Sequence, residues 1–184
     1  MSLKADMSDS AYDFQRAVWP AIATSLGGGR LIPVETVVDS GFSKTLDVVA
    51  GIDAWHVDDG ERGMRGIASR VQWGPRAWES FTVRRSVRSG VPTEFEKRTI
   101  ALSGERGYLY PHVTVHAYVA TRRTGDLLSC AVIRTEDLIS LCDERWWRPN
   151  PSDGSTFYYV DWSRVRAEGT RMFWWPDDLR QGAA

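Results

Sequence analysis

The fold of this chain depends on two apolar runs, Leu46-Asp47-Val48-Val49-Ala50-Gly51-Ile52-Asp53-Ala54-Trp55-His56-Val57 and Gly66-Ile67-Ala68-Ser69-Arg70-Val71-Gln72-Trp73. The charged, glycine-bearing segment 58–63 separates them. Apolar and β-branched residues that flank a polar loop predict a β-hairpin. The first run is apolar at nearly every position, which predicts a strand buried on both faces.

Asp53 is the unusual residue of the first run. A carboxylate within an apolar strand is costly unless it is paired or ligated. Two partners are open at this point: a divalent metal ion, or an internal ion pair with Arg70 or Arg84.

Composition sets the class of protein. The chain has 184 residues, of which 42% are hydrophobic and 26% charged, which is typical of one globular domain. No run approaches the ~18 apolar residues of a membrane helix, and no apolar signal core begins the chain, so we expect a cytoplasmic protein. Residues 1–10 are polar and are expected to be disordered or a remnant of cloning. Cys130 and Cys142 are expected to be reduced thiols, and their spacing does not predict zinc.

Charge is unevenly distributed. Residues 1–61 carry a net charge of −6, residues 62–98 carry +6, and residues 99–184 carry −1. The basic segment suits a phosphate-bearing partner, or it protects a solvated sheet edge. The nine tryptophans, with pairs at Trp146-Trp147 and Trp174-Trp175, serve either base stacking or the core.

Periodicity predicts the remaining elements. Apolar residues at Phe14, Val18, Ile22 and Leu26 indicate a helix over 11–26, and Thr93 with Glu96 forms a capping box for a second helix. The predicted strands are a short one within 30–38, the two hairpin strands, a third meander strand over 80–87, and strands over 110–120, 127–134 and 157–161. Short helical segments are expected over 135–142 and from Ser163. Together these elements predict an α/β or α+β domain with a mixed central sheet flanked by helices.

The order helix, strand, strand, strand, helix, strand over residues 11–120 resembles the restriction-endonuclease-like, or PD-(D/E)XK, nuclease superfamily. The resemblance implies a single nuclease-like domain over 11–184 with a Trp-rich C-terminal extension. It also implies that Asp53, in Gly51-Ile52-Asp53-Ala54, binds Mg²⁺, which activates water and stabilises charge on the phosphate. The second triplet of the family is replaced here by Ser69-Arg70-Val71-Gln72-Trp73.

The resemblance implies roles for further residues. Gln72 stands in for the second acid and Arg70 supplies the positive charge, although arginine is a poor base. Glu79 is the candidate second metal ligand, and Arg70, Arg84 and Lys97 are candidates to bind phosphate. Asp47 lies six residues before Asp53, which is about 20 Å along an ideal strand, so it shares a metal only if the chain bends at Gly51. His56 falls on the opposite face from Asp53, and His112 and His116 lie too far apart on a strand to share one metal.

Three functions therefore remain open. The first is a metal-dependent nuclease, or a degenerate relative, acting on the phosphodiesters of nucleic acid. The second is a non-catalytic module, of phage or mobile-element origin, that binds nucleic acid or protein. The third is a protein–protein assembly unit that uses the aromatic C-terminal third. Serine hydrolase and nicotinamide motifs are missing from the sequence.

Overall fold

The computed structural model describes residues 3–34, 40–60, 63–105 and 107–178. Its N-terminal helical segment joins α1 (Leu3–Asp13), η1 (Phe14–Val18), α2 (Trp19–Ile22) and η2 (Ala23–Leu26). The segment begins at Leu3, ahead of the expected Ala11, so residues 3–10 are helical where disorder was expected. It ends where Gly27 adopts a left-handed φ of 93°, a conformation that glycine reaches without strain.

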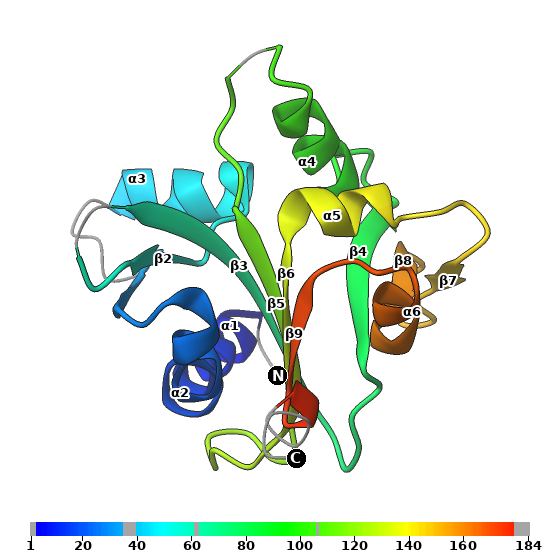
Figure 1. Cartoon of the computed structure of the whole chain (residues 1–184). Helices are drawn as coiled ribbons and strands as arrows, with labels where there is room; N and C mark the ends of the chain where they lie inside the picture. The colour runs from blue at the N-terminus through cyan, green and yellow to red at the C-terminus, as the bar shows by residue number, and fades with distance from the viewer. Residues whose placement is uncertain (1–2, 35–39, 61–62, 106, 179–184) are drawn as a thin grey trace.

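A mixed six-stranded sheet forms the centre of the molecule (Figure 1). Its order is β1-β2-β3-β5-β6-β9, with β3 and β5 parallel and the other pairs antiparallel. The strands are β1 (Arg30–Pro33), β2 (Ala54–Val57), β3 (Met64–Trp73), β5 (Val113–Val119), β6 (Leu127–Arg134) and β9 (Met172–Trp175). The predicted hairpin is confirmed, because β2 and β3 pair from Ala54 with Ile67 to Val57 with Met64.

The third strand of the expected meander lies elsewhere. β4 (Ser80–Ser86) forms a three-stranded sheet with β8 (Thr156–Asp161) and β7 (Trp147–Pro149). The meander prediction was therefore wrong, and β1 and β5 flank the hairpin instead. The Trp174-Trp175 pair lies in β9, an edge strand that the sequence had not indicated.

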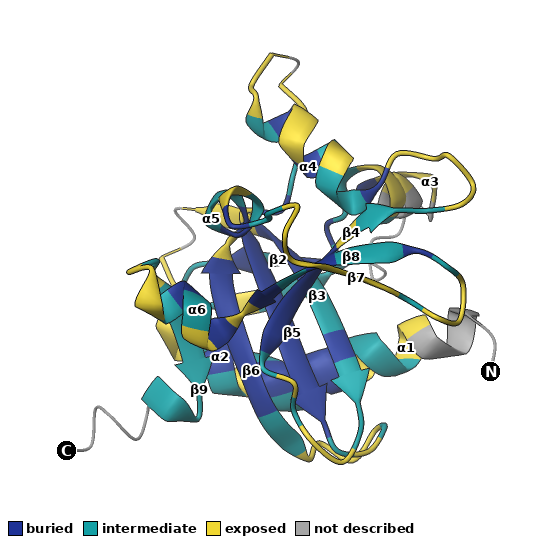
Figure 2. Cartoon of the chain, turned by 90° about the vertical axis from the view of Figure 1, so that its right-hand side faces the viewer, coloured by how far each residue is buried: buried dark blue, intermediate teal, exposed yellow. Residues whose placement is uncertain are grey.

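Two apolar cores cover the two faces of the central sheet. On one face, Phe14, Val18 and Ile22 of the helical segment pack with apolar residues of β3, β5 and β6. On the other, the three-stranded sheet, α5 (Thr135–Ser140) and α6 (Trp162–Ala167) pack against β5 and β6 around the fully buried Trp162. Figure 2 shows the buried strands between these layers. The expected α+β class with a mixed sheet flanked by helices is thus confirmed.

The largest correction concerns the first apolar run. Its first half is helical: α3 (Ser40–Thr45) continues into η4 (Leu46–Ala50), and Gly51 ends the helix with a φ of 65°. Leu46 is buried, whereas Val48 and Val49 are 54% and 62% exposed, so this half is not a buried strand. Asp53 directly precedes β2, and its N–H donates to Ile67 O over 2.8 Å.

The helix that follows β4 forms as the capping box predicts. In α4 (Glu94–Leu102), Thr93 Oγ1 accepts the Glu96 N–H and the Glu96 carboxylate accepts the Thr93 N–H. This cap fixes the start of α4, and therefore positions Glu94 and the helical residues after it. Cys130 and Cys142 are free thiols, as expected. Within the described ranges, no helix has the length and apolar character needed to cross a membrane.

Candidate functional site

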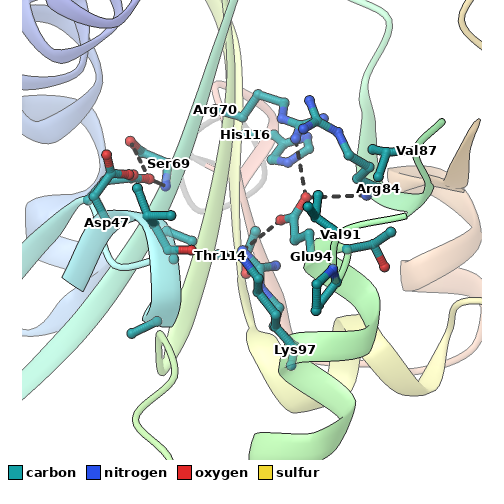
Figure 3. A pocket seen from close by; sticks show the side chains of 18 residues that line it. Asp47, Ser69, Arg70, Arg84, Val87, Val91, Glu94, Lys97, Thr114 and His116 are labelled. Carbon is teal, nitrogen blue, oxygen red and sulfur yellow. Dashed lines mark hydrogen bonds and ion pairs between the residues drawn. The ribbon is translucent and has the colours of Figure 1, made fainter. Parts of the chain in front are cut away.

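A cleft lies at the junction of η4, β3, β4 and α4. It comprises two adjoining cavities of about 350 Å³ and about 660 Å³. The first is walled by α4 and η4, and the second extends between α1, β1 and β3. The two cavities share five of their lining residues, Asp47, Asp53, Ser69, Arg70 and Arg84. In Figure 3, Asp47 and Ser69 lie on one side of the first cavity, and Arg70, Arg84, Glu94 and His116 lie on the other.

Two carboxylates, Asp47 and Asp53, form what we term the acid pair. The turn at Gly51 brings Asp47 back towards Asp53, which is the bend on which a shared metal had depended. Asp53 Oδ2 accepts the Ser69 N–H over 2.5 Å and the Ser69 hydroxyl over 3.3 Å. In the part of the chain that the structure describes, no donor meets Asp53 Oδ1. The ion pair expected as the alternative, with Arg70 or Arg84, is not formed, because other groups hold both arginines.

The acid pair is destabilised as an anion. Burial, with a further contribution from Asp47, raises the pKa of Asp53 to about 7, although the Ser69 donors and Arg98 oppose the rise. Burial also raises the pKa of Asp47, against the opposing charge of Lys97. Two carboxyl groups that repel each other in a cleft are stabilised in their ionised form by a bound cation.

Arg70, Glu94 and Arg98 form what we term the arginine–glutamate cluster. Arg98 Nη2 lies 2.7 Å from Glu94 Oε1, and Arg70 Nη2 lies 3.2 Å from Glu94 Oε2. Glu94 Oε2 also accepts the Arg84 N–H over 3.2 Å. Burial acts to raise the pKa of Glu94, but Arg98, Arg70 and the Arg84 N–H outweigh it and lower the pKa to about 2. Glu94 is therefore held as a carboxylate between two guanidiniums, and the cluster keeps a net charge of +1.

His116 borders the same cavity as a neutral side chain. It is 2% exposed, and burial together with the charge of Arg70 lowers its pKa to about 3. Its Nδ1 accepts the Thr82 N–H over 3.2 Å. His116 is therefore a fixed polar contact between the two sheets at neutral pH. His56 lines neither cavity, and its Nε2 is 2.7 Å from Gly28 O.

Four of the six site residues predicted from the sequence line the first cavity: Asp53, Arg70, Arg84 and Lys97. Arg84 is exposed and its guanidinium lies 5.4 Å from the centroid of the Phe157 ring. Lys97 Nζ donates to Val48 O over 2.7 Å, next to Asp47. Arg70 is bound to Glu94 and Thr82, so it is a poor candidate for a catalytic proton carrier.

The other two predicted residues, Gln72 and Glu79, lie outside both cavities. Gln72 pairs with Tyr118 of β5, further along β3 than Arg70. Glu79 precedes the opposite end of β4 from Arg84, where burial and the nearby Asp177 raise its pKa. The structure therefore does not bring Glu79 to Asp53, because β4 belongs to the second sheet.

The sequence prediction missed Glu94 and Arg98, and it placed Asp47 too far away. Glu94 and Arg98 are four residues apart on a helix whose cap was recognised, and this spacing is the available signal for their ion pair. For Asp47, the signal was Ser40 and Gly51 at the two ends of an apolar segment, as at the ends of a helix.

The acid pair provides only oxygen ligands. No group of three or more His, Cys, Asp or Glu side chains suited to a metal ion occurs among the described residues. Two carboxylates nevertheless fit Mg²⁺, which binds through one or two carboxylates and retains several waters. Comparisons with family models, curated proteins and solved structures gave no match to this chain.

Proposed function

We propose that the chain is a metal-dependent nuclease, or a degenerate relative of one, that acts on nucleic acid phosphodiesters at the cleft. The observation that carries this proposal is the acid pair, in which Asp53 has one carboxylate oxygen without a described donor and a pKa raised by burial and by Asp47. Such a pair repels itself when both groups are ionised, and a bound divalent cation removes that repulsion.

Asp53 and Asp47 would hold Mg²⁺ in this proposal. The ion would supply Lewis acidity and an activated water at the phosphate. Arg84 and Lys97 line the same cavity and offer positive charge to a phosphodiester beside the acid pair. Arg70 orients the site through Glu94, since its guanidinium is already bound to that carboxylate.

A binding module without catalysis is the second candidate. It is favoured by the pairing of Arg70 with Glu94 and by Lys97, whose ammonium donates to Val48 O rather than to the acid pair. In the described ranges no third carboxylate joins Asp47 and Asp53 as a possible metal ligand. In that case the cleft would bind a phosphodiester and leave it intact.

The test measures Mn²⁺ binding by electron paramagnetic resonance and Mg²⁺-dependent cleavage of nucleic acid by gel. Asp53→Asn is expected to abolish both, and Asp47→Asn is expected to weaken Mn²⁺ binding. The matched control is Asp126→Asn, because Asp126 is exposed in the loop between β5 and β6. Anomalous density beside Asp53 in crystals soaked with Mn²⁺ would locate the ion directly.

Each outcome separates the candidates. Loss of Mn²⁺ binding and of cleavage in Asp53→Asn, with both retained in Asp126→Asn, supports the nuclease. Nucleic acid binding without cleavage in any divalent ion supports the module. Unchanged Mn²⁺ binding in Asp53→Asn would rule out the metal role of the acid pair.

A further inference from the structure

Cations and aromatic rings alternate on one face of the three-stranded sheet. Arg84 of β4 and Arg148 of β7 are both cross-strand partners of Phe157 in β8. Side chains of directly paired residues share a face, and Tyr159, two residues after Phe157, shares it too. We term this set, Arg84, Arg148, Phe157 and Tyr159, the stacking face.

The two arginines of the stacking face are held by rings rather than by carboxylates. The Arg84 guanidinium lies 5.4 Å from the Phe157 centroid, and the Arg148 guanidinium lies 4.4 Å from the Tyr159 centroid. Both arginines are exposed, and across the described ranges neither guanidinium has a carboxylate at ion-pair distance. The charge of Arg84 helps to lower the pKa of Asp153, but the Asp153 carboxylate accepts hydrogen bonds from the N–H and hydroxyl of Ser155. The face therefore retains positive charge.

A nearby arginine shows the contrasting arrangement. Arg85 also stacks on an exposed ring, with its guanidinium 5.1 Å from the Trp147 centroid. However, Arg85 Nη2 lies 2.6 Å from Glu144 Oε2, so a carboxylate neutralises this cation. All three arginines therefore stack on rings, but Arg84 and Arg148 differ from Arg85 in having no carboxylate partner among the described residues.

The stacking face adjoins the acid pair. Arg84 belongs to this face and also lines both cavities together with Asp47 and Asp53. Cavities of about 350 Å³ and about 660 Å³ are the size of small-molecule sites. We take this size to suit the individual nucleotides of one strand better than a base-paired duplex.

We infer that the nucleic acid recognised by the cleft is single-stranded, with bases stacked on Phe157 and Tyr159 and phosphates bound by Arg84 and Arg148. This inference rests on the proposed function for its substrate, since it assigns the strand that reaches the acid pair. Half-buried rings with cations alongside are the combination that binds single strands without sequence preference.

The test is fluorescence anisotropy with the full chain in EDTA, which prevents metal-dependent cleavage. The probes are a labelled oligodeoxythymidylate of about 12 nucleotides and a hairpin duplex of similar length. The single strand is expected to bind at least about tenfold more tightly than the hairpin. Tyr159→Leu, which keeps an apolar side chain but removes the ring, is expected to weaken single-strand binding roughly fivefold or more.

Arg148→Ala is expected to weaken binding as well, and to reduce the slope of log affinity against log salt by about 0.7. The matched control is Arg76→Ala, because the Arg76 guanidinium also stacks on a ring, 4.1 Å from the Trp78 centroid, but Arg76 lies between β3 and β4, outside the stacking face. Near-ultraviolet circular dichroism checks that each variant is folded.

Equal or tighter binding of the hairpin would overturn the inference, as would wild-type affinity in both Tyr159→Leu and Arg148→Ala. Failure of the wild-type chain to bind the single strand would also overturn it. The proposed function fails separately, through Mn²⁺ binding that does not depend on Asp53. A chain that binds Mn²⁺ through Asp53 and cleaves only duplex would support the proposed function and contradict the inference of a single-stranded substrate.

Discussion

The acid pair and the arginine–glutamate cluster face each other across one cavity, yet the pKa values of their carboxyl groups are shifted in opposite directions. Glu94 is bound by Arg70, Arg98 and the Arg84 N–H, and its pKa falls to about 2. Among the described residues, the two Ser69 donors alone meet the Asp53 carboxylate, and its pKa rises to about 7. Both residues are half-buried, so burial does not cause the difference.

The partners of each carboxyl group cause it. Two guanidiniums meet Glu94, whereas Asp53 faces a second carboxylate in Asp47. A carboxylate whose oxygens already accept from protein donors has no free oxygen for a ligand, and it stabilises the fold. A carboxylate with an open oxygen and a like-charged neighbour offers a cation site and costs stability when it ionises. The cluster is thus expected to be structural, and the acid pair is expected to be functional.

The largest expected effect follows from removing the charge of Glu94. Glu94→Gln leaves Arg98, which is 5% exposed, without a carboxylate, and breaking a buried ion pair in this way costs about 3 kcal/mol of unfolding free energy. Urea unfolding at pH 7 measures the loss. The matched control is Glu96→Gln on the same helix, whose amide oxygen still accepts the Thr93 N–H. Equal losses in both variants would contradict a special role for the cluster.

The pH dependence of the same carboxyl group provides an independent measurement. Because folding lowers the pKa of Glu94 from 4.5 to about 2, the folded state releases this proton more readily than the unfolded state. The stabilisation is complete above about pH 4.5 and is lost as the pH falls towards 2. Glu94→Gln should therefore be less stable than wild type at pH 6, and the gap should narrow on acidification.

Most of the scaffold follows from the sequence, because its signals are local. The capping box at Thr93, the hairpin around 58–63 and the alternation in 110–120 each predict an element that the structure contains. The pairing of distant strands is not local. β4 has the composition of a meander strand, and only its contacts with β8, more than 70 residues later, move it to the second sheet.

The site was harder to predict for a related reason. An apolar run such as Leu46–Ala50 fits a buried strand and a short helix equally well, and periodicity does not decide between them. That choice determines whether Asp47 lies far from Asp53 or beside it. Glu79 failed in the converse way, because its role as a ligand required β4 to lie next to β3.

The second prediction concerns the acid pair, where stability changes with pH in the opposite direction. Because folding raises the pKa of Asp53 from 3.8 to about 7, wild-type stability falls as the pH rises through this window. Asp53→Asn has no such proton, and its amide oxygen still accepts the Ser69 N–H. Relative to wild type, the variant should gain about 1–2 kcal/mol between pH 5 and pH 8, less than the full shift because the residue is half-buried.

Urea unfolding in EDTA at pH 5 and pH 8 measures this gain. Addition of Mg²⁺ at pH 8 should offset much of this gain, since a Mg²⁺ concentration of ten times the dissociation constant stabilises wild type by about 1.4 kcal/mol and leaves Asp53→Asn unchanged. A difference in stability between variant and wild type that stays constant from pH 5 to pH 8 would show that Asp53 is already ionised throughout this range, like Glu94.

The smallest expected effect comes from Lys97, which connects the two regions. Lys97 belongs to α4 with Glu94 and Arg98, but its Nζ donates to Val48 O and its charge opposes the raised pKa of Asp47. Lys97→Met removes a positive charge that competes with a cation at the acid pair. Mn²⁺ affinity is expected to rise about twofold to threefold, with a loss of stability of about 0.5 kcal/mol or less. Titration followed by paramagnetic resonance measures the affinity, with Arg76→Ala as the distant control for loss of one positive charge. If Mn²⁺ affinity instead falls, Lys97 holds η4 and Asp47 in position for the metal, and α4 then supports both regions instead of opposing one of them.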